Sequence, residues 1–271
     1  MVVLYFGDIF GKPGRRAIKQ ILPDLKQKYQ PDFILGNAEN LAGGKGINKR
    51  TYHEMMEMGF DLLTSGNHIW DNKEVLSLFE TNAKLIRPSN FPDSPRERCP
   101  GKGRFLLEKN GFSLLVINLM GRVFMDSIEC PFIEVDRVLA QQRSPVSILV
   151  DMHADATSEK YAMGWHLNGR VSAVVGSHSH VQTADDQILP GGTAYITDVG
   201  MTGAFHSVIG MKPEEVIRRF MTKRKVMVQQ AKENPGISCV VITINDQHKA
   251  TAIERIRQSV SGIDVEEGDL I

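Results

Sequence analysis

Two histidines flank a single serine in the segment VVGSHSHVQ (174–182), directly after a run of apolar residues. In an extended chain, side chains at positions i and i+2 point the same way and lie roughly 6.5–7 Å apart. One metal ion would demand a closer approach of His178 and His180, whereas two neighbouring ions would allow each histidine its own. The spacing therefore predicts a binuclear metal centre that these two side chains straddle.

Other side chains that can bind metals also follow short apolar runs. The candidate ligands are Asp8, Glu39, Asn40, Asn67, His153, His178 and His180. Each alone is ordinary turn chemistry or a hydrogen-bonded loop histidine, but together they form the ligand set of hard-to-borderline divalent ions. One catalytic ion usually takes about three protein ligands, so this set indicates two ions, each with four ligands if Glu39 bridges them. The donors favour Fe or Mn, with Zn as an alternative.

Predicted β-strands and predicted α-helices alternate along the part of the chain that must position these donors. Buried strands are predicted at 2–8, 32–37, 61–67, 113–119, 146–153 and 171–178. Helices are predicted between them at 14–29, 49–58, 72–80, 133–142 and 155–165. This alternation predicts an α/β layered fold, and in open α/β sheets binding sites form outside the carboxyl ends of the strands. We expect Asn48 to cap the second helix and Pro23 to kink or split the first.

The last third of the chain has a different pattern. Strands predicted at 191–200, 238–245 and 249–256 are joined by short turns, which suggests a second, more antiparallel sheet. Asn110-Gly111 is a strong hairpin signal between two apolar runs. Residues 87–104 are rich in Pro, Gly and Arg and are expected to form a long surface excursion. We expect a single domain over 1–271, with a loop and hairpin excursion near 87–130.

Composition excludes several functional classes. The 271 residues carry a formal net charge of zero, so no global basic field is available to hold a nucleic-acid backbone. The N-terminus lacks the basic region of a signal peptide, and no apolar run approaches the roughly 18 residues of a membrane helix. Three widely spaced cysteines argue against a disulfide framework and for a reducing compartment. We therefore expect a cytoplasmic protein without a membrane partner.

Longer ordered blocks resemble a known family. The segments GD (7–8), GNAEN (36–40), GNH (66–68), His153 and GSHSH (176–180) resemble the motifs of calcineurin-like metallophosphoesterases. The resemblance is closest to the bacterial YmdB-like branch and covers most of the chain. It includes the segments NLMGRVFM (118–125), HADATSEK (153–160), GSHSHVQTAD (176–185) and YITDVGMTG (195–203).

This resemblance implies a fold, an activity and a distribution of ligands. The implied fold is an α/β/β/α four-layer sandwich of two mixed β-sheets flanked by helices. The implied activity is that of a phosphodiesterase acting on 2′,3′-cyclic nucleotides, in a homo-oligomer. Asp8, Glu39, Asn40 and His180 would hold one ion, and Glu39, Asn67, His153 and His178 the other.

The chain departs from the wider superfamily at two ligand positions. The superfamily usually has Asp-x-His in its first block, whereas Phe10 stands at the histidine position here. Asn40 is the natural replacement, as in the YmdB-like branch. Glu39 stands where a bridging Asp is usual, and its extra methylene should alter the metal geometry.

A mechanism follows as a hypothesis. A hydroxide bridging the two ions would attack phosphorus, while the ions neutralise phosphate oxygens. His68 directly follows the ligand Asn67 and is the candidate general acid, with Asp71 orienting it. The substrate would be a phosphodiester, either a cyclic nucleotide or an RNA end. Two alternatives stay open: a phosphomonoesterase on the same core, or a non-catalytic regulator that binds a nucleotide or an RNA-processing partner.

Several other features match no ligand position. We expect surface or packing roles for His53, His166, His206 and His248. The loop GGKG (43–46) lacks the spacing of a Walker A motif and is either a turn or a phosphate contact. The segment GMTG (200–203) is similarly ambiguous, and the basic run 218–225 is a solvated helix face or an RNA contact.

Overall fold

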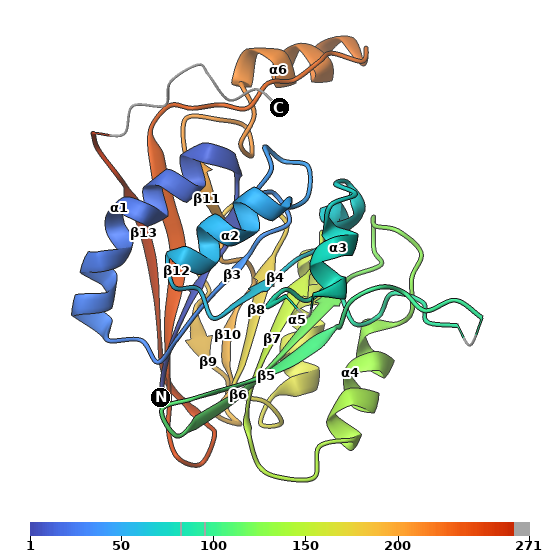
Figure 1. Cartoon of the computed structure of the whole chain (residues 1–271), viewed down its shortest axis with the longest axis vertical. Helices are drawn as coiled ribbons and strands as arrows, with labels where there is room; N and C mark the ends of the chain where they lie inside the picture. Colours follow the sequence, from blue (N-terminus) through green and yellow to red (C-terminus); the bar gives the residue numbers. More distant parts are fainter. Residues whose placement is uncertain (82, 95, 263–271) are drawn as a thin grey trace.

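A seven-stranded sheet forms one half of the molecule (Figure 1). The computed structural model describes residues 1–81, 83–94 and 96–262. The strand order is β2 (Asp8–Ile9), β11 (Met201–Ala204), β12 (Pro235–Ile244), β1 (Val2–Phe6), β3 (Phe33–Asn37) and β4 (Leu62–Thr64), with β13 (Ala250–Ser259) paired to β12. Strand β1 runs parallel to β3 and antiparallel to β12. The sheet is therefore mixed, with parallel pairing among β1, β3 and β4 and between β2 and β11.

The second sheet has six strands. Their order is β5 (Arg104–Lys109), β6 (Phe112–Met120), β7 (Ser147–His153), β8 (Ala173–Ser177), β10 (Ala194–Ile196) and β9 (Gln187–Ile188). Strands β6, β7, β8 and β10 are parallel, and β5 and β9 pair antiparallel at the two edges. The hairpin between β5 and β6 turns at Asn110 and Gly111, whose φ values of 52° and 81° are those of a type I′ turn. The hairpin prediction is confirmed.

Helices cover the outer face of each sheet. In the described part of the chain these are α1 (Gly11–Tyr29), α2 (Lys49–Glu57), α3 (Val75–Glu80), α4 (Pro131–Ala140) and α5 (Thr157–Leu167), whereas α6 (Pro213–Thr222) has no buried residue and covers neither sheet. Alternate residues of β1 belong to different core clusters: Leu4 and Phe6 pack with α1 and α2, whereas Val3 and Tyr5 pack against the second sheet. A third cluster joins the outer face of the second sheet to α4 and α5. The predicted four-layer sandwich is confirmed.

Most predicted elements are present, with two corrections in the first half. All six predicted strands form, and the Asn48 side chain caps α2 by accepting a hydrogen bond from the Thr51 amide. Of the two outcomes predicted for Pro23, a kink or a split of the first helix, the split is wrong, because Pro23 lies inside a continuous α1. Burial of Ile18, Leu22 and the other apolar side chains of α1 offsets the lost helix bond. The third helix begins at Val75 rather than at residue 72.

The last third of the chain does not build a separate antiparallel sheet, contrary to expectation. Strand β12 pairs along β1, and β13 extends the same sheet beyond it. Strand β10 instead joins the second sheet, parallel to β8. The apolar run of β12 is buried on both faces, which its position next to the central strand β1 explains. Among the described residues, no helix is both long and apolar enough to cross a membrane.

Candidate metal centre

The seven predicted ligands meet at the carboxyl ends of five strands. Asp8 begins β2 just after β1, Glu39 and Asn40 follow β3, and His153 ends β7. Asn67 starts the short 3₁₀ helix η1 (Asn67–Trp70) after β4, and His178 and His180 follow β8. Side chains from the strand ends of one sheet contact side chains from the strand ends of the other. The strand-end prediction from the sequence therefore describes one real cluster.

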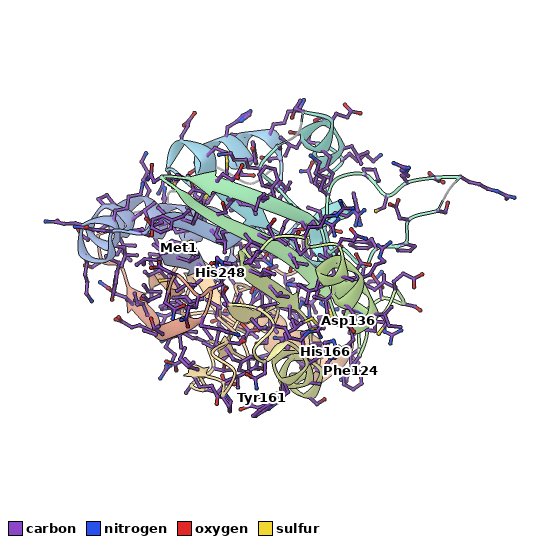
Figure 2. All side chains as sticks on the ribbon, turned by 90° about the horizontal axis from the view of Figure 1, so that it is seen from below. Met1, Phe124, Asp136, Tyr161, His166 and His248 are labelled. Carbon is purple, nitrogen blue, oxygen red and sulfur yellow. The ribbon has the colours of Figure 1, made fainter. Side chains whose placement is uncertain are left out.

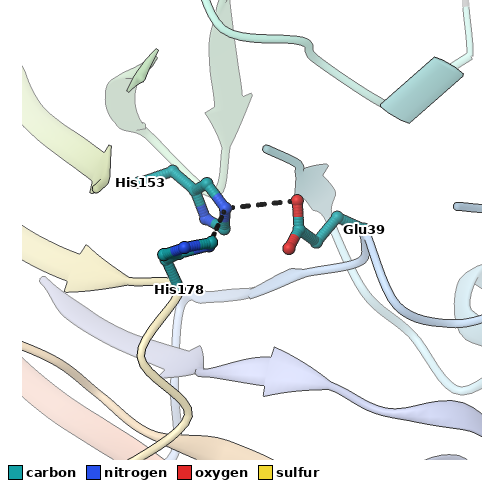
Figure 3. A group of neighbouring side chains, drawn as sticks. All are labelled: Glu39, His153 and His178. Atoms are coloured by element: carbon teal, nitrogen blue, oxygen red, sulfur yellow. Dashed lines mark hydrogen bonds and ion pairs between the residues drawn. The ribbon is translucent and has the colours of Figure 1, made fainter. Parts of the chain in front are cut away.

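One group of donors surrounds His153. Its Nε2 lies 3.2 Å from Glu39 Oε2, 3.0 Å from Asn67 Oδ1 and 3.1 Å from His178 Nδ1. Figure 3 shows the two imidazoles and the Glu39 carboxylate facing a common point. Two ring nitrogens at this distance suit a shared cation, because both lone pairs can then be used.

A second group lies on the other side of Glu39. It contains Asp8, Glu39 and His180, whose donor atoms lie within 4.8 Å of one another. His180 Nε2 is 3.8 Å from Asp8 Oδ1 and 3.2 Å from Asn40 Nδ2. The Asn40 amide presents its nitrogen here, so ligation through oxygen requires a 180° flip of that amide.

Glu39 connects the two groups through its separate oxygens. Oε2 faces His153 and also accepts a hydrogen bond from the His68 amide at 3.2 Å. Oε1 accepts a hydrogen bond from Asn40 Nδ2 at 3.1 Å, on the side of His180. A carboxylate shared in this way can bridge two cations.

The segment that carries both histidines is a turn rather than the extended chain expected from the sequence. Strand β8 ends at Ser177, and His178 and His180 have φ values of 98° and 63°. Such left-handed conformations cost about 1–3 kcal/mol for residues other than glycine. The His178 amide donates to Asp8 Oδ2 at 3.0 Å and the Ser179 amide to Asp198 Oδ2 at 3.0 Å. Two buried carboxylates therefore hold the turn, and this turn places the imidazoles in different groups.

A buried network behind His153 orients its ring. His153 Nδ1 is 2.9 Å from Ser177 Oγ, which donates to Asp151 Oδ1 at 2.7 Å. The other oxygen of Asp151 accepts from Tyr5 at 2.6 Å and from Thr64 at 2.5 Å. Occupying Nδ1 leaves Nε2 directed at the other donors, as metal-binding histidines require. Nothing in the sequence pattern distinguishes Asp151 from an ordinary strand residue.

The pKa values of these groups are shifted because the groups are buried close to one another. Burial lowers the pKa of His153, but the carboxylates of Glu39, Asp8 and Asp151 together outweigh burial and raise the pKa to about 9. Burial raises the pKa of Glu39, but the imidazoles of His153 and His68 pull it down to about 2. Burial raises the pKa of Asp8 to about 6, and burial next to His153 lowers that of His178 to about 3. A protonated His153 thus supplies positive charge among the buried carboxylates. A bound metal cation would supply positive charge at the same place.

Two further observations fit a metal centre. Asp8 Oδ1 is fully buried and has no hydrogen-bond partner, which is costly unless a cation uses it. Gly66 faces the first group so closely that a Cβ would lie 2.2 Å from His153 Nε2 and 2.3 Å from Glu39 Oε2. The buried mixture of carboxylate and imidazole donors suits divalent cations. We conclude that these residues can hold such ions.

The predicted acid–base pair stands at the rim of the cluster. His68 Nδ1 is 2.8 Å from Asp71 Oδ2, and both side chains are about 40% exposed (39% and 42%). The pairing with Asp71 matches the expected orienting contact. His68 therefore combines a fixed ring with access to solvent, next to the candidate ligand Asn67 in η1.

Two groups of residues near the site had no clear signal in the sequence. Asp155 Oδ2 lies 3.8 Å from His178 Nε2, and Asp198 pairs with Lys160, whose Nζ is 2.6 Å away. Both Lys160 and Asp198 are buried. Lys160 lies on a predicted helix, where a lysine is normally solvent-exposed, so only the resemblance blocks at 153–160 and 195–203 hinted at them.

The remaining histidines lie outside the cluster. His166 contacts Asp136 at 2.9 Å, and His248 contacts Ser147 at 2.9 Å. Figure 2 labels His166 and His248 on the side of the molecule seen from below. His53 and His206 are exposed. Part of the basic run at 218–225 lies on α6, none of whose residues is buried.

The chain is similar to known proteins over most of its length. The model of the family described as YmdB-like protein matches residues 4–256. A 2′,3′-cyclic-nucleotide 2′-phosphodiesterase of Bacillus subtilis is 48% identical over 94% of this chain and 96% of its own length. A putative phosphatase/phosphodiesterase of Mycoplasma genitalium is 36% identical over 94% of this chain and 92% of its own.

Solved structures show the same fold. A hypothetical protein from Thermus thermophilus is 42% identical with a TM-score of 0.89, over 96% of this chain and 99% of that one. A phosphatase from Mycoplasma pneumoniae is 35% identical with a TM-score of 0.90, over 96% and 93%. A putative 5′-nucleotidase from Staphylococcus aureus, 12% identical with a TM-score of 0.62, covers 99% of this chain and 57% of that one and shares the fold alone.

Proposed function

Because the chain belongs to the YmdB-like family, we propose that it is a metal-dependent phosphodiesterase that hydrolyses 2′,3′-cyclic nucleotides or related RNA ends. The observation that carries the proposal is the position of Glu39. Its two oxygens face two separate donor groups, and each group contains at least one histidine. A two-site centre of this kind suits displacement at phosphorus. The similarity to a relative named for this activity supports the same substrate class.

Each side chain then has a defined task. In our assignment, one cation is held by Asp8, Glu39, Asn40 and His180, and the other by Glu39, Asn67, His153 and His178. When bound, the two ions supply an activated water nucleophile and neutralise charge on the phosphate. The network from Tyr5 through Asp151 to Ser177 keeps His153 Nε2 directed at the other donors, where it would help to hold a cation.

His68 is our candidate for the general acid. Its Nδ1–H donates to the Asp71 carboxylate, which orients the ring and leaves Nε2 to face the leaving oxygen. The half-exposed position allows the ring to reach a bound ester and to be reprotonated from water. The His68 amide bond to Glu39 ties this acid to the metal-binding carboxylate.

The finer properties also belong to the proposal. We expect Fe or Mn at the centre, with Zn as an alternative, because carboxylate and imidazole donors are mixed. A cytoplasmic homo-oligomer is expected from the family resemblance. Elemental analysis and sedimentation velocity measure the metals and the assembly directly.

The test combines metal content with turnover. Protein purified under metal-replete conditions should contain about two metal equivalents and hydrolyse 2′,3′-cyclic AMP. Hydrolysis of an aryl phosphate monoester in preference to a bis-aryl diester would indicate a phosphomonoesterase instead. Full metal content without turnover of any phosphoester would favour a non-catalytic binding protein.

A further inference from the structure

A cavity of about 370 Å³ opens beside the metal centre, next to His180. Its walls include His180, Phe205, Ile209 and Arg257. The His180 ring joins the two spaces, because Nε2 faces Asp8 and Asn40 whereas Nδ1 is 3.0 Å from the Ile209 carbonyl oxygen. The volume lies in the range of small-molecule sites.

Arg257 and Phe205 form a flat pair on this wall. The Arg257 guanidinium lies 4.1 Å from the centre of the Phe205 ring. The ring is backed by Gly236, where a Cβ would lie 2.3 Å from Phe205 Cε2. The pair is therefore supported from behind by the backbone of β12.

Arg257 differs from the arginine two positions earlier on the same strand. Arg255 forms an ion pair with Asp186 at 2.7 Å. Among residues 1–81, 83–94 and 96–262, Arg257 forms no ion pair with a carboxylate, and its guanidinium lies against the Phe205 ring. An arginine stacked on an aromatic ring at a cavity wall, without a carboxylate to neutralise it, is suited to bind a planar electron-rich ligand.

We propose that this cavity binds the nucleoside part of the substrate, with the base stacked against the Arg257–Phe205 pair. The inference rests on the proposed phosphodiesterase function, because the scissile phosphate must lie at the metal centre. The nucleoside attached to that phosphate must then occupy adjoining space, and the cavity shares His180 with the centre. Nucleobases stack on arginine planes and aromatic rings and accept hydrogen bonds from guanidinium N–H groups.

The binding experiment uses adenosine, which lacks the phosphate. Adenosine binding to the metal-loaded full-length protein is measured by calorimetry for the wild type, Arg257→Ala, Arg257→Lys and Arg255→Ala. Loss of stacking should weaken binding about tenfold in Arg257→Ala. Arg257→Lys keeps the charge but loses the plane and should also bind weakly. Arg255→Ala, which removes a paired arginine of the same strand, should bind like the wild type.

The kinetic experiment separates the contribution of base binding from the hydrolysis of the phosphodiester. The ratio of kcat/KM for 2′,3′-cyclic AMP to that for ribose 2′,3′-cyclic phosphate should fall about tenfold in Arg257→Ala and stay constant in Arg255→Ala. An unchanged ratio together with unchanged adenosine binding would overturn the inference, as would an equal loss in Arg255→Ala. If the wild type hydrolyses neither cyclic phosphate, the proposed function fails, while the adenosine measurement still decides whether the cavity binds nucleosides.

Discussion

Lys160 and Asp198 form a buried ion pair, with Lys160 Nζ 2.6 Å from Asp198 Oδ2, directly behind the turn that carries the two site histidines. The same carboxylate oxygen accepts the Ser179 amide at 3.0 Å, and Oδ1 accepts the Gly200 amide at 2.8 Å. Lys160 belongs to α5 and Asp198 follows β10, so the pair ties two separate elements to this turn. The segments 153–160 and 195–203, which both resemble the family, thus meet at this ion pair.

Asp198→Asn should weaken metal binding about 10- to 100-fold, as loss of a partner behind the ligands typically does. An asparagine offers only one oxygen, so either amide orientation turns an NH₂ group toward a donor, Ser179 N–H or Gly200 N–H. Metal titration and the Mn(II) electron paramagnetic resonance spectrum measure the effect.

Two further variants separate this positioning effect from loss of stability. Lys160→Met also breaks the buried pair but keeps both amide bonds, so it should lower the melting temperature with a smaller loss of metal affinity. Asp61→Asn is a matched control, because Asp61 also accepts a backbone amide (from Ile34) and a lysine (Lys109). Equal metal affinity in Asp198→Asn and Asp61→Asn would contradict the positioning role.

His178→Ala and His180→Ala should each remove about one of two metal equivalents, because the two rings belong to different donor groups. The double variant should bind almost none. Elemental analysis after gel filtration measures the content. Loss of both metals in one single variant and none in the other would show that both ions depend on one histidine.

His68→Ala should lower kcat about 10²- to 10⁴-fold while metal content stays unchanged, if the side chain protonates the leaving group. The loss should be smaller for a substrate with a p-nitrophenolate leaving group, which needs no proton. His53→Ala is a suitable control, since His53 is an exposed histidine of α2 away from the ligands. Wild-type turnover in His68→Ala would exclude the acid role.

Gly66→Ala should reduce metal content even though its backbone has no left-handed φ (−156°). The new methyl group would lie 2.2 Å from His153 Nε2, so either the imidazole or η1 must shift. Circular dichroism should remain native, because the clash involves the ends of two side chains rather than the core. Unchanged metal affinity would show that the donor side chains can move apart to make room for the methyl group and still bind metal.

The chelated protein should lose stability as the pH rises from about 6.5 to 9. Folding raises the pKa of His153 from its ordinary 6.5 to about 9, so its contribution is complete below pH 6.5 and disappears as the pH passes 9. One proton changes the free energy of unfolding by at most about 1.4 kcal/mol per pH unit. Thermal melts in chelator at several pH values measure the slope.

A histidine variant and metal reloading test the origin of that slope. His153→Gln should flatten the decline above pH 6.5, because the titrating group is gone. Adding metal should also flatten it, since ligands bind cations in their deprotonated form. An identical slope in the wild type and His153→Gln would assign the pH dependence to other groups.

Much of the site was predictable because its chemistry is local in the sequence. Asp8, Glu39, Asn67, His153 and His178 each lie at or just after the end of an apolar strand, and parallel strand ends share one edge of a sheet. Periodicity and turn residues also predicted an α/β layered fold, the β5–β6 hairpin and the cap at Asn48, whereas the four-layer sandwich was implied by the family resemblance. The placement of β12 was not predictable, because an apolar run does not indicate which sheet it joins.

The sequence by itself therefore determined which donor types are present and that they lie at strand ends, since residue type and periodicity are properties of short segments. Only the tertiary structure decided which oxygen of Glu39 faces which histidine and that His178 and His180 lie on a left-handed turn. It also brought Lys160 to Asp198, 38 residues away, and buried both. These outcomes depend on how separate elements pack, because a buried charge is tolerated only where another element supplies its partner.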